Sequence, residues 1–299
     1  MNVLEIKGLY KSFGKKNVLR GLDLAIPEHS VFGFVGRNGA GKTTAMKAVL
    51  GLLRVDEGEI FVCGEPVTFG QTATNKYIGY LPDVPAFYPY MTAREYLTLC
   101  GESHGIFGEE LRARCDELLS LVGLSDDRSR IKGYSRGMKQ RLGIAQALLA
   151  RPKLLICDEP TSALDPIGRK QILDILLSVR EETTVIFSTH ILSDVERICT
   201  DVAIINNGKI EMQGPVGELR SADRGAGFLI ELTDAEACPV VAEAFAEASL
   251  CEDGSLRLDG NDEKLFEALE FIKEKGYSIR KIERVESSLE ALFMEVVEK

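Results

Sequence analysis

A glycine-rich segment at residues 36–43, Gly-Arg-Asn-Gly-Ala-Gly-Lys-Thr, narrows the possible folds because it matches the pattern G-x-x-x-x-G-K-[ST]. An apolar run at residues 31–35 precedes it and indicates a buried strand, and residues 42–53 have the composition of a helix. Glycines let the backbone wrap tightly, so that successive N–H groups and the helix N-terminus point at phosphate oxygens. The order strand, loop, helix therefore predicts an α/β fold with a site for the phosphates of a nucleoside triphosphate.

Two other interpretations of this loop have to be weighed. A dinucleotide-binding turn, G-x-G-x-x-G, needs a third glycine at position 44 after Gly39 and Gly41, and Thr44 stands there. A glycine turn that merely starts a helix is the structural alternative. We favour a nucleoside triphosphate, with Lys42 reaching its β- and γ-phosphates and Thr43 binding Mg²⁺. The loop residues expected to bind the nucleotide are Gly36, Asn38, Gly39, Ala40, Gly41, Lys42, Thr43 and Thr44.

A second chemical motif is the apolar run at residues 154–157, which ends in the carboxylates Asp158 and Glu159. Adjacent side chains of a strand point in different directions, so one carboxylate can hold a metal while the other faces water. We assign Asp158 to Mg²⁺, and Glu159 to orienting or deprotonating the attacking water. Such pairs often only cap a strand end, and it is the phosphate loop upstream that favours the catalytic interpretation.

His190 follows a strand-like run at residues 184–189, which places it at the carboxyl edge of the sheet, where ligands of open α/β folds bind. There it is expected to hydrogen-bond the γ-phosphate or the catalytic carboxylate. A structural role is the alternative, as for any lone histidine. His29 and His104 have no comparable context.

The pattern before and after the loop predicts the rest of the first domain. Alternating apolar residues around the polar turn at residues 14–17 predict an antiparallel hairpin. Residues 92–150 have helical spacing and open with a capping box, Thr92-x-x-Glu95, which predicts a helical insertion. Strand-like runs separated by helical stretches follow it and predict a parallel sheet, in which Asp165 caps a helix and residues 206–209 form a hairpin turn.

Residues 221–227 have linker composition, and we place the domain boundary there. Beyond it, residues 228–299 alternate strand and helix patterns three times and contain no recognisable catalytic constellation. A small α+β module for packing or dimerisation is the simplest interpretation, and a ligand-sensing module is the alternative.

Charge and composition exclude several function classes. With 36 Lys and Arg against 46 Asp and Glu, the net charge is −10, which argues against sequence-independent nucleic-acid binding. The apolar runs fall far short of the roughly 20 residues that span a bilayer, and the first residues lack the order of a signal peptide. A cytoplasmic location is therefore expected. The 7 cysteines include no CxxC and support neither a disulfide framework nor a zinc site.

Five motifs in this order resemble those of the ATP-binding subunit of an ABC transporter. They are residues 36–44, 134–141, 154–160, 162–165 and His190. The resemblance covers residues 1–220 and is far more specific than the phosphate loop alone. Within the family the chain is most similar to stand-alone ATPase subunits of multidrug or sodium efflux type.

The resemblance implies further nucleotide contacts. Phe13 would stack on adenine, although it could equally be a core residue. Residues 134–138 take the place of the family signature Leu-Ser-Gly-Gly-Gln, in which Ser135 and Gly137 would contact the γ-phosphate bound to the opposite subunit of a head-to-tail dimer. Asp165 would belong to the loop that links the two composite sites. The departures from the signature are Tyr134, Arg136 and Met138.

Another departure lies at Asp83, where the family usually has glutamine. Asp83 can ligate Mg²⁺, but it adds negative charge near the γ-phosphate. Activity is expected to be retained because the other site residues are present, namely Lys42, Thr43, Asp158, Glu159 and His190. By the same resemblance, residues 85–91 form a docking surface for a cytoplasmic helix of the membrane partner, with a packed loop as the alternative.

Together these observations predict an α/β P-loop NTPase domain of ABC type at residues 1–220, with a mixed sheet, an antiparallel β subdomain and a helical insertion, followed by an α+β domain at residues 228–299. The expected function is ATP hydrolysis that powers transport, by resemblance export, through a separate membrane-embedded permease. ATP and Mg²⁺ would be bound between this chain and a second copy or a related subunit, at the inner face of the membrane. The alternatives are a non-transport regulatory ATPase and a subunit that binds ATP without hydrolysing it.

Overall fold

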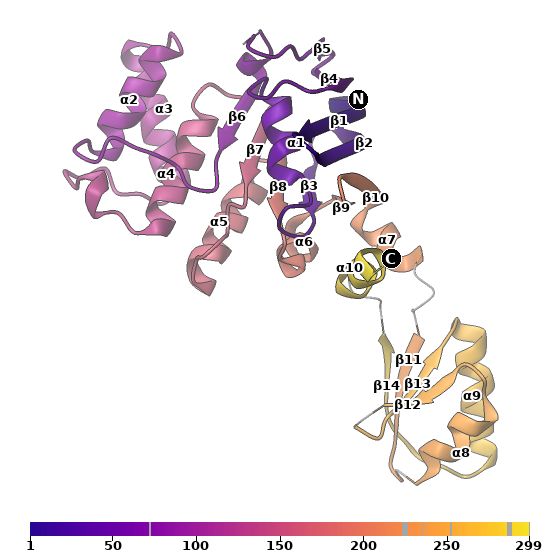
Figure 1. The fold of residues 1–299 in the computed structure, drawn as a ribbon. Helices are drawn as coiled ribbons and strands as arrows, with labels where there is room; N and C mark the ends of the chain where they lie inside the picture. Colours follow the sequence, from indigo (N-terminus) through magenta and orange to yellow (C-terminus); the bar gives the residue numbers. More distant parts are fainter. Residues whose placement is uncertain (72, 223–226, 235, 252, 286–288, 299) are drawn as a thin grey trace. The chain divides into compact units, whose positions relative to one another are not determined.

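The computed structural model of the chain describes residues 1–299 except 72, 223–226, 235, 252, 286–288 and 299. The chain divides into two compact units, Met1–Pro215 and Val216–Lys299, which are described separately (Figure 1). Residues 223–226 of the expected linker at 221–227 lie outside the described residues.

The first unit opens with an antiparallel sheet whose strand order is β2-β1-β4-β5. The predicted hairpin is confirmed: β1 pairs with β2, and Leu4 lies opposite Ile26. β4 was not expected, because its first half is acidic and exposed, and its pairing with β1 is what makes it a strand. The strands are β1 (Asn2–Phe13), β2 (Lys16–Pro27), β4 (Glu57–Val62) and β5 (Glu65–Pro66).

A six-stranded sheet of order β10-β9-β3-β8-β7-β6 forms the centre of the unit (Figure 1). Neighbouring strands are parallel except at the β9–β10 hairpin, so the predicted parallel sheet is confirmed and the carboxyl ends of β3, β7 and β8 share one edge. These three strands are buried along their whole length, as parallel strands covered on both faces usually are. The strands are β3 (Val31–Val35), β6 (Ile78–Leu81), β7 (Leu154–Asp158), β8 (Thr184–Thr189), β9 (Asp201–Asn206) and β10 (Lys209–Pro215).

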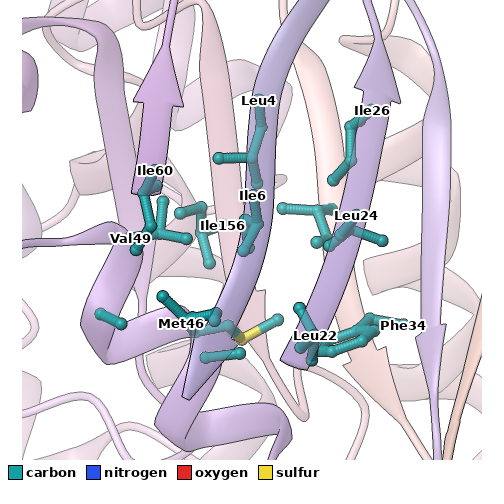
Figure 2. Close-up of a cluster of buried hydrophobic side chains, with 14 of the residues drawn as sticks. Leu4, Ile6, Leu22, Leu24, Ile26, Phe34, Met46, Val49, Ile60 and Ile156 are labelled. Atoms are coloured by element: carbon teal, nitrogen blue, oxygen red, sulfur yellow. The ribbon is translucent and has the colours of Figure 1, made fainter. Parts of the chain in front are cut away.

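Apolar side chains of both sheets and of helix α1 (Lys42–Val49) share one core. Figure 2 shows Met46 and Val49 of α1 beside Ile6 of β1 and Ile156 of β7. Each such side chain contributes about 1.5–3 kcal/mol when fully buried, and this packing fixes α1 directly behind the loop that precedes it.

The predicted helical insertion is confirmed as three helices, and Thr92 and Glu95 form the expected capping box. Helix α1 ends at Val49 rather than continuing to residue 53, because Gly51 adopts a left-handed conformation (φ 68°) that stops the helix. The other helices of the unit are α2 (Ala93–Ser103), α3 (Gly108–Leu121), α4 (Arg136–Leu148), α5 (Pro166–Ser178) and α6 (Leu192–Ile198), with 3₁₀ turns η1 (Ala73–Tyr77) and η2 (Ile131–Gly133).

The second unit contains an antiparallel sheet of order β12-β13-β11-β14 with α8 and α9 on one face (Figure 1). From β11 to β14 the order of elements, β-α-β-β-α-β, is that of a ferredoxin-like fold. The three expected strand–helix pairs are present, and the short strand β12 is additional. The elements are α7 (Val216–Ala222), β11 (Gly227–Leu232), α8 (Ala237–Ala244), β12 (Ala248–Leu250), β13 (Leu256–Asp259), α9 (Asp262–Glu274), β14 (Ile279–Val285) and α10 (Leu289–Glu298).

Candidate functional site

The loop between β3 and α1 packs closely against strands β2 and β9. Gly39 and Gly41 adopt left-handed conformations, with φ of 85° and 115°. A Cβ at Gly41 would lie 2.8 Å from Leu19 Cδ2, and one at Gly36 would lie 2.6 Å from the carbonyl oxygen of Ile205. The N-terminus of α1 has no side-chain cap and no acidic residue in its first turn, so its free N–H groups suit an anion.

Lys42 is held inside this loop. Its side chain is only 6% exposed, and its Nζ donates to the carbonyl oxygen of Gly36 at 2.7 Å. The same Nζ lies 3.4 Å from Glu159 Oε1. These contacts keep the ammonium group between the loop and the end of β7, where a bound phosphate would meet both.

Asp158, the last residue of β7, is buried and bonded at both carboxylate oxygens. Thr43 Oγ1 donates to its Oδ2 at 2.8 Å, and Ser188 Oγ donates to its Oδ1 at 2.7 Å. Ser188 also accepts a hydrogen bond from the backbone N–H of Glu159 at 2.9 Å. Ser188 is not among the residues expected from the sequence, although its place at the end of β8, two residues before His190, is a usable signal.

Glu159 lies just beyond the strand in a left-handed conformation with φ of 48°. Its Oε2 lies 3.0 Å from His190 Nδ1, and its Oε1 faces Lys42. The structure therefore brings together three residues that are far apart in the sequence, because the strands that carry them end at the same edge of the sheet.

These groups surround a cavity of about 760 Å³, a size usual for small-molecule sites. Phe13 lines one end with a half-exposed ring, and the Lys11 ammonium lies 5.3 Å from the ring centroid. The cavity also contains residues not expected from the sequence, namely Lys16, Val18, Lys47, Tyr80, Pro82 and Val84. The expected residues that line it are Phe13, Asn38, Gly39, Gly41, Lys42, Thr43, Thr44, Asp83, Asp158 and Glu159.

Tyr80 lines this cavity with a partly buried phenol. Burial, followed by the nearby carboxylates Asp158 and Asp83, raises the pKa of its phenol to about 12. The hydroxyl therefore stays protonated near neutral pH and is available as a hydrogen-bond donor.

Asp83 lines the cavity, but its carboxylate is engaged by a side chain of α4. Arg136 Nη2 donates to Asp83 Oδ1 at 3.2 Å, and the buried amide of Gln140 donates to the backbone oxygen of Asp83 at 2.8 Å. The departures at residues 83 and 136 thus form one contact between the loop after β6 and the first turn of α4.

Ser135, Gly137 and Asp165 are not in the nucleotide-sized cavity; they line a second cavity of about 300 Å³ between α4 and α5. Ser135 caps α4 by accepting from the N–H of Met138 at 3.2 Å, and Asp165 caps α5 by accepting from the N–H of Gly168 at 3.2 Å. Two helix N-termini therefore meet at this surface.

Comparison with known protein families gives a direct match. A family model described as "ABC transporter" matches residues 19–162. The uncharacterized ABC transporter ATP-binding protein YxlF of Bacillus subtilis is 40% identical over 233 residues, which cover 78% of this chain and 77% of YxlF. The bacitracin transport ATP-binding protein BcrA of Bacillus licheniformis is 34% identical over 301 residues, which cover 99% of this chain and 97% of BcrA.

Solved structures give the same result. The structure of an ATP-binding subunit of an ABC transporter superposes with a TM-score of 0.67 at 30% identity and covers 74% of this chain and 92% of that one. CbiO1 of Clostridium perfringens, part of the ABC transporter complex CbiONQ, has a TM-score of 0.67 at 26% identity and covers 74% of this chain and 91% of its own. The resemblance and the fold class inferred from the sequence are confirmed. Among the described residues, no helix is both long enough and apolar enough to cross a bilayer.

Proposed function

The chain belongs to the family of ABC transporter ATP-binding proteins, and we propose that it hydrolyses ATP in the larger cavity to drive export through a separate membrane permease. The main support is the convergence of the phosphate-binding loop, Lys42, Asp158 and Glu159 on that cavity. A non-transport role is not favoured, because BcrA aligns with 99% of this chain and is named a transport ATP-binding protein.

The loop and Lys42 bind the phosphates, and Phe13 provides an aromatic face for the base. Thr43 Oγ1 and Asp158 Oδ2, which are 2.8 Å apart, offer the hard oxygen ligands that Mg²⁺ prefers. When bound, Mg²⁺ would neutralise charge that develops on the transferred phosphoryl group.

Glu159 is placed to orient the attacking water and take its proton. Its contacts with Lys42 and His190 hold the carboxylate in place, and His190, 46% exposed, can hydrogen-bond the γ-phosphate. General-base assistance of this kind contributes about 10²- to 10⁴-fold in rate.

A second copy, or a related subunit, completes the site. Ser135 and Gly137 lie at the N-terminus of α4, where N–H groups and the helix dipole favour a phosphate presented by a partner. No described residue lines both cavities, and we infer that the second cavity of one chain faces the nucleotide held by the other. ATP binds the closed dimer more tightly than the open one, and this difference in affinity drives closure.

The permease docks on the aromatic loop at residues 85–91, which leads into α2. This contact holds the chain at the cytoplasmic face of the membrane. Phe87 packs edge-on against Tyr96 with ring centroids 5.0 Å apart, whereas Tyr88 and Tyr90 are 50% and 61% exposed. Val84 at the rim of the nucleotide cavity is 70% exposed. A helix that packs on this surface would be close to the loop containing Asp83.

Glu159→Gln tests the proposal. The variant keeps the shape of the side chain but removes the base, so it should bind ATP and Mg²⁺, form a stable dimer by light scattering, and release phosphate at least about 100-fold more slowly than the wild type. Glu181→Gln changes an exposed glutamate (side chain 78% exposed) and should behave as wild type. A Glu159→Gln chain that stays monomeric with ATP and hydrolyses it normally would refute the proposal.

A further inference from the structure

A buried carboxylate outside both cavities links the two segments that carry Glu159 and His190. Asp194 lies in the first turn of α6, and its side chain is 3% exposed. Thr161 Oγ1 donates to Asp194 Oδ2 at 2.8 Å, and Arg169 Nε donates to Asp194 Oδ1 at 2.5 Å. Arg169 Nη2 also donates to Ser193 Oγ at 2.9 Å. One side chain therefore joins the turn after β7, helix α5 and helix α6.

The turn that Thr161 belongs to is conformationally strained. Glu159 and Ala163, on either side of it, both have left-handed backbones with φ of 48° and 53°. Non-glycine residues adopt this region at a cost, and they stay there only when neighbouring contacts over-determine the conformation. Thr161 is buried and lies two residues from each of them. Its hydroxyl donates a hydrogen bond to the side chain of Asp194.

Asp194 is also close in sequence to the histidine. Ile191 N–H donates to Thr189 Oγ1 at 3.0 Å and Asp194 N–H donates to the backbone oxygen of Ile191 at 3.2 Å, so the segment from β8 to α6 is a short ordered turn with His190 in it. A shift of α6 would carry His190 with it and lengthen its 3.0 Å contact with Glu159.

We propose that Asp194 is a positioning residue, whose carboxylate binds Thr161 and Arg169 and thereby keeps Glu159 and His190 in contact. The inference rests on the proposed function, because it concerns the same hydrolysis. Neither Asp194 nor its two partners line the nucleotide cavity, so they act through the residues that do. Arg169 belongs to the helix capped by Asp165, and the network therefore also ties the loop at residues 162–165 to the catalytic pair.

The test uses the full-length chain and isosteric changes of Thr161. Thr161→Val removes the hydroxyl and should lower kcat for ATP hydrolysis by about 10- to 100-fold, as small misplacements of catalytic groups do, with KM for ATP unchanged. Thr161→Ser keeps the hydroxyl and should restore most of kcat. Asp194→Asn, which can no longer accept from both partners, should resemble Thr161→Val.

Thr183→Val is the matched control, because Thr183 is equally buried and its hydroxyl donates to the backbone oxygen of Pro152 at 2.9 Å, away from the site. Both valine variants should lose melting temperature, but only Thr161→Val should lose kcat. In a His190→Ala background Thr161→Val should cost much less than in the wild type, because the contact it supports is already gone.

The outcomes separate the two proposals. An active wild type in which Thr161→Val and Thr183→Val have the same kcat, or in which the losses from Thr161→Val and His190→Ala multiply, would overturn the positioning role alone. A wild type that releases no phosphate would overturn the proposed function and the positioning role with it.

Discussion

Asp83 and Arg136 each depart from the usual ABC pattern, yet in this molecule they contact each other. Their side chains are 48% and 43% exposed, and exposed ion pairs contribute at most about 1 kcal/mol to stability. The pair joins the loop beside the nucleotide to the first turn of α4, so its effect should fall on turnover rather than on unfolding. Each departure by itself would place an unpaired charge near the nucleotide site, whereas the contact pairs the two opposite charges.

We expect Asp83→Asn and Arg136→Gln each to lower kcat by up to about fivefold, the equivalent of about 1 kcal/mol. The double variant should be no slower than either single variant, because both remove the same contact. Phosphate release measures this, and high salt should narrow the differences. Lys76→Gln breaks an exposed pair with Glu65, away from these helices, and should leave kcat unchanged. Losses that multiply in the double variant would contradict the coupling.

Among the elements, the start of α5 is set by local sequence, because Asp165 is its N-cap and a proline lies in its first turn. Asp165→Ala should lower the free energy of unfolding by about 1 kcal/mol in urea denaturation, whereas Asp165→Asn keeps a capping oxygen and should unfold like the wild type. Asp165 also lines the second cavity. The asparagine variant removes its negative charge there and keeps the helix cap, so it separates the two roles. Equal destabilisation by both variants would show that the cap is not what stabilises α5.

Elements with a strong local signal could be predicted, and those that depend on distant partners could not. The strand, loop and start of α1, and the capping box at Thr92, follow from short patterns in the sequence. β4 is half acidic and becomes a strand because β1 pairs with it, and the end of α1 depends on the backbone conformation of Gly51. At β4, pairing with a neighbouring strand overrides the low strand propensity of the acidic residues. At the end of α1, the backbone conformation of Gly51 decides where the helix stops.

For the whole molecule, the parallel sheet explains why the candidate site could be predicted in outline. Lys42 and His190 follow two different strands and Asp158 ends a third, and the rule that ligands bind at the carboxyl edge brings them together. The rule does not give the lateral contacts between helices, so the Asp194 network could not be placed from the sequence, whereas Ser188 could have been found from its place at the end of β8. A hydroxyl or carboxylate that bonds a distant turn carries no sequence pattern of its own.

The two units give a final prediction, because each has its own core and all residues lining the nucleotide cavity belong to Met1–Pro215. ADP with Mg²⁺ at about 100 times its Kd should stabilise that unit by about 2.7 kcal/mol. Hydrogen exchange should then slow in its core strands and stay the same in β11 and β13. Ile156→Val and Ile230→Val are matched core variants, each costing about 0.5–1.5 kcal/mol, and only the first should be offset by nucleotide. Equal protection of both units would show that nucleotide binding also stabilises the ferredoxin-like unit.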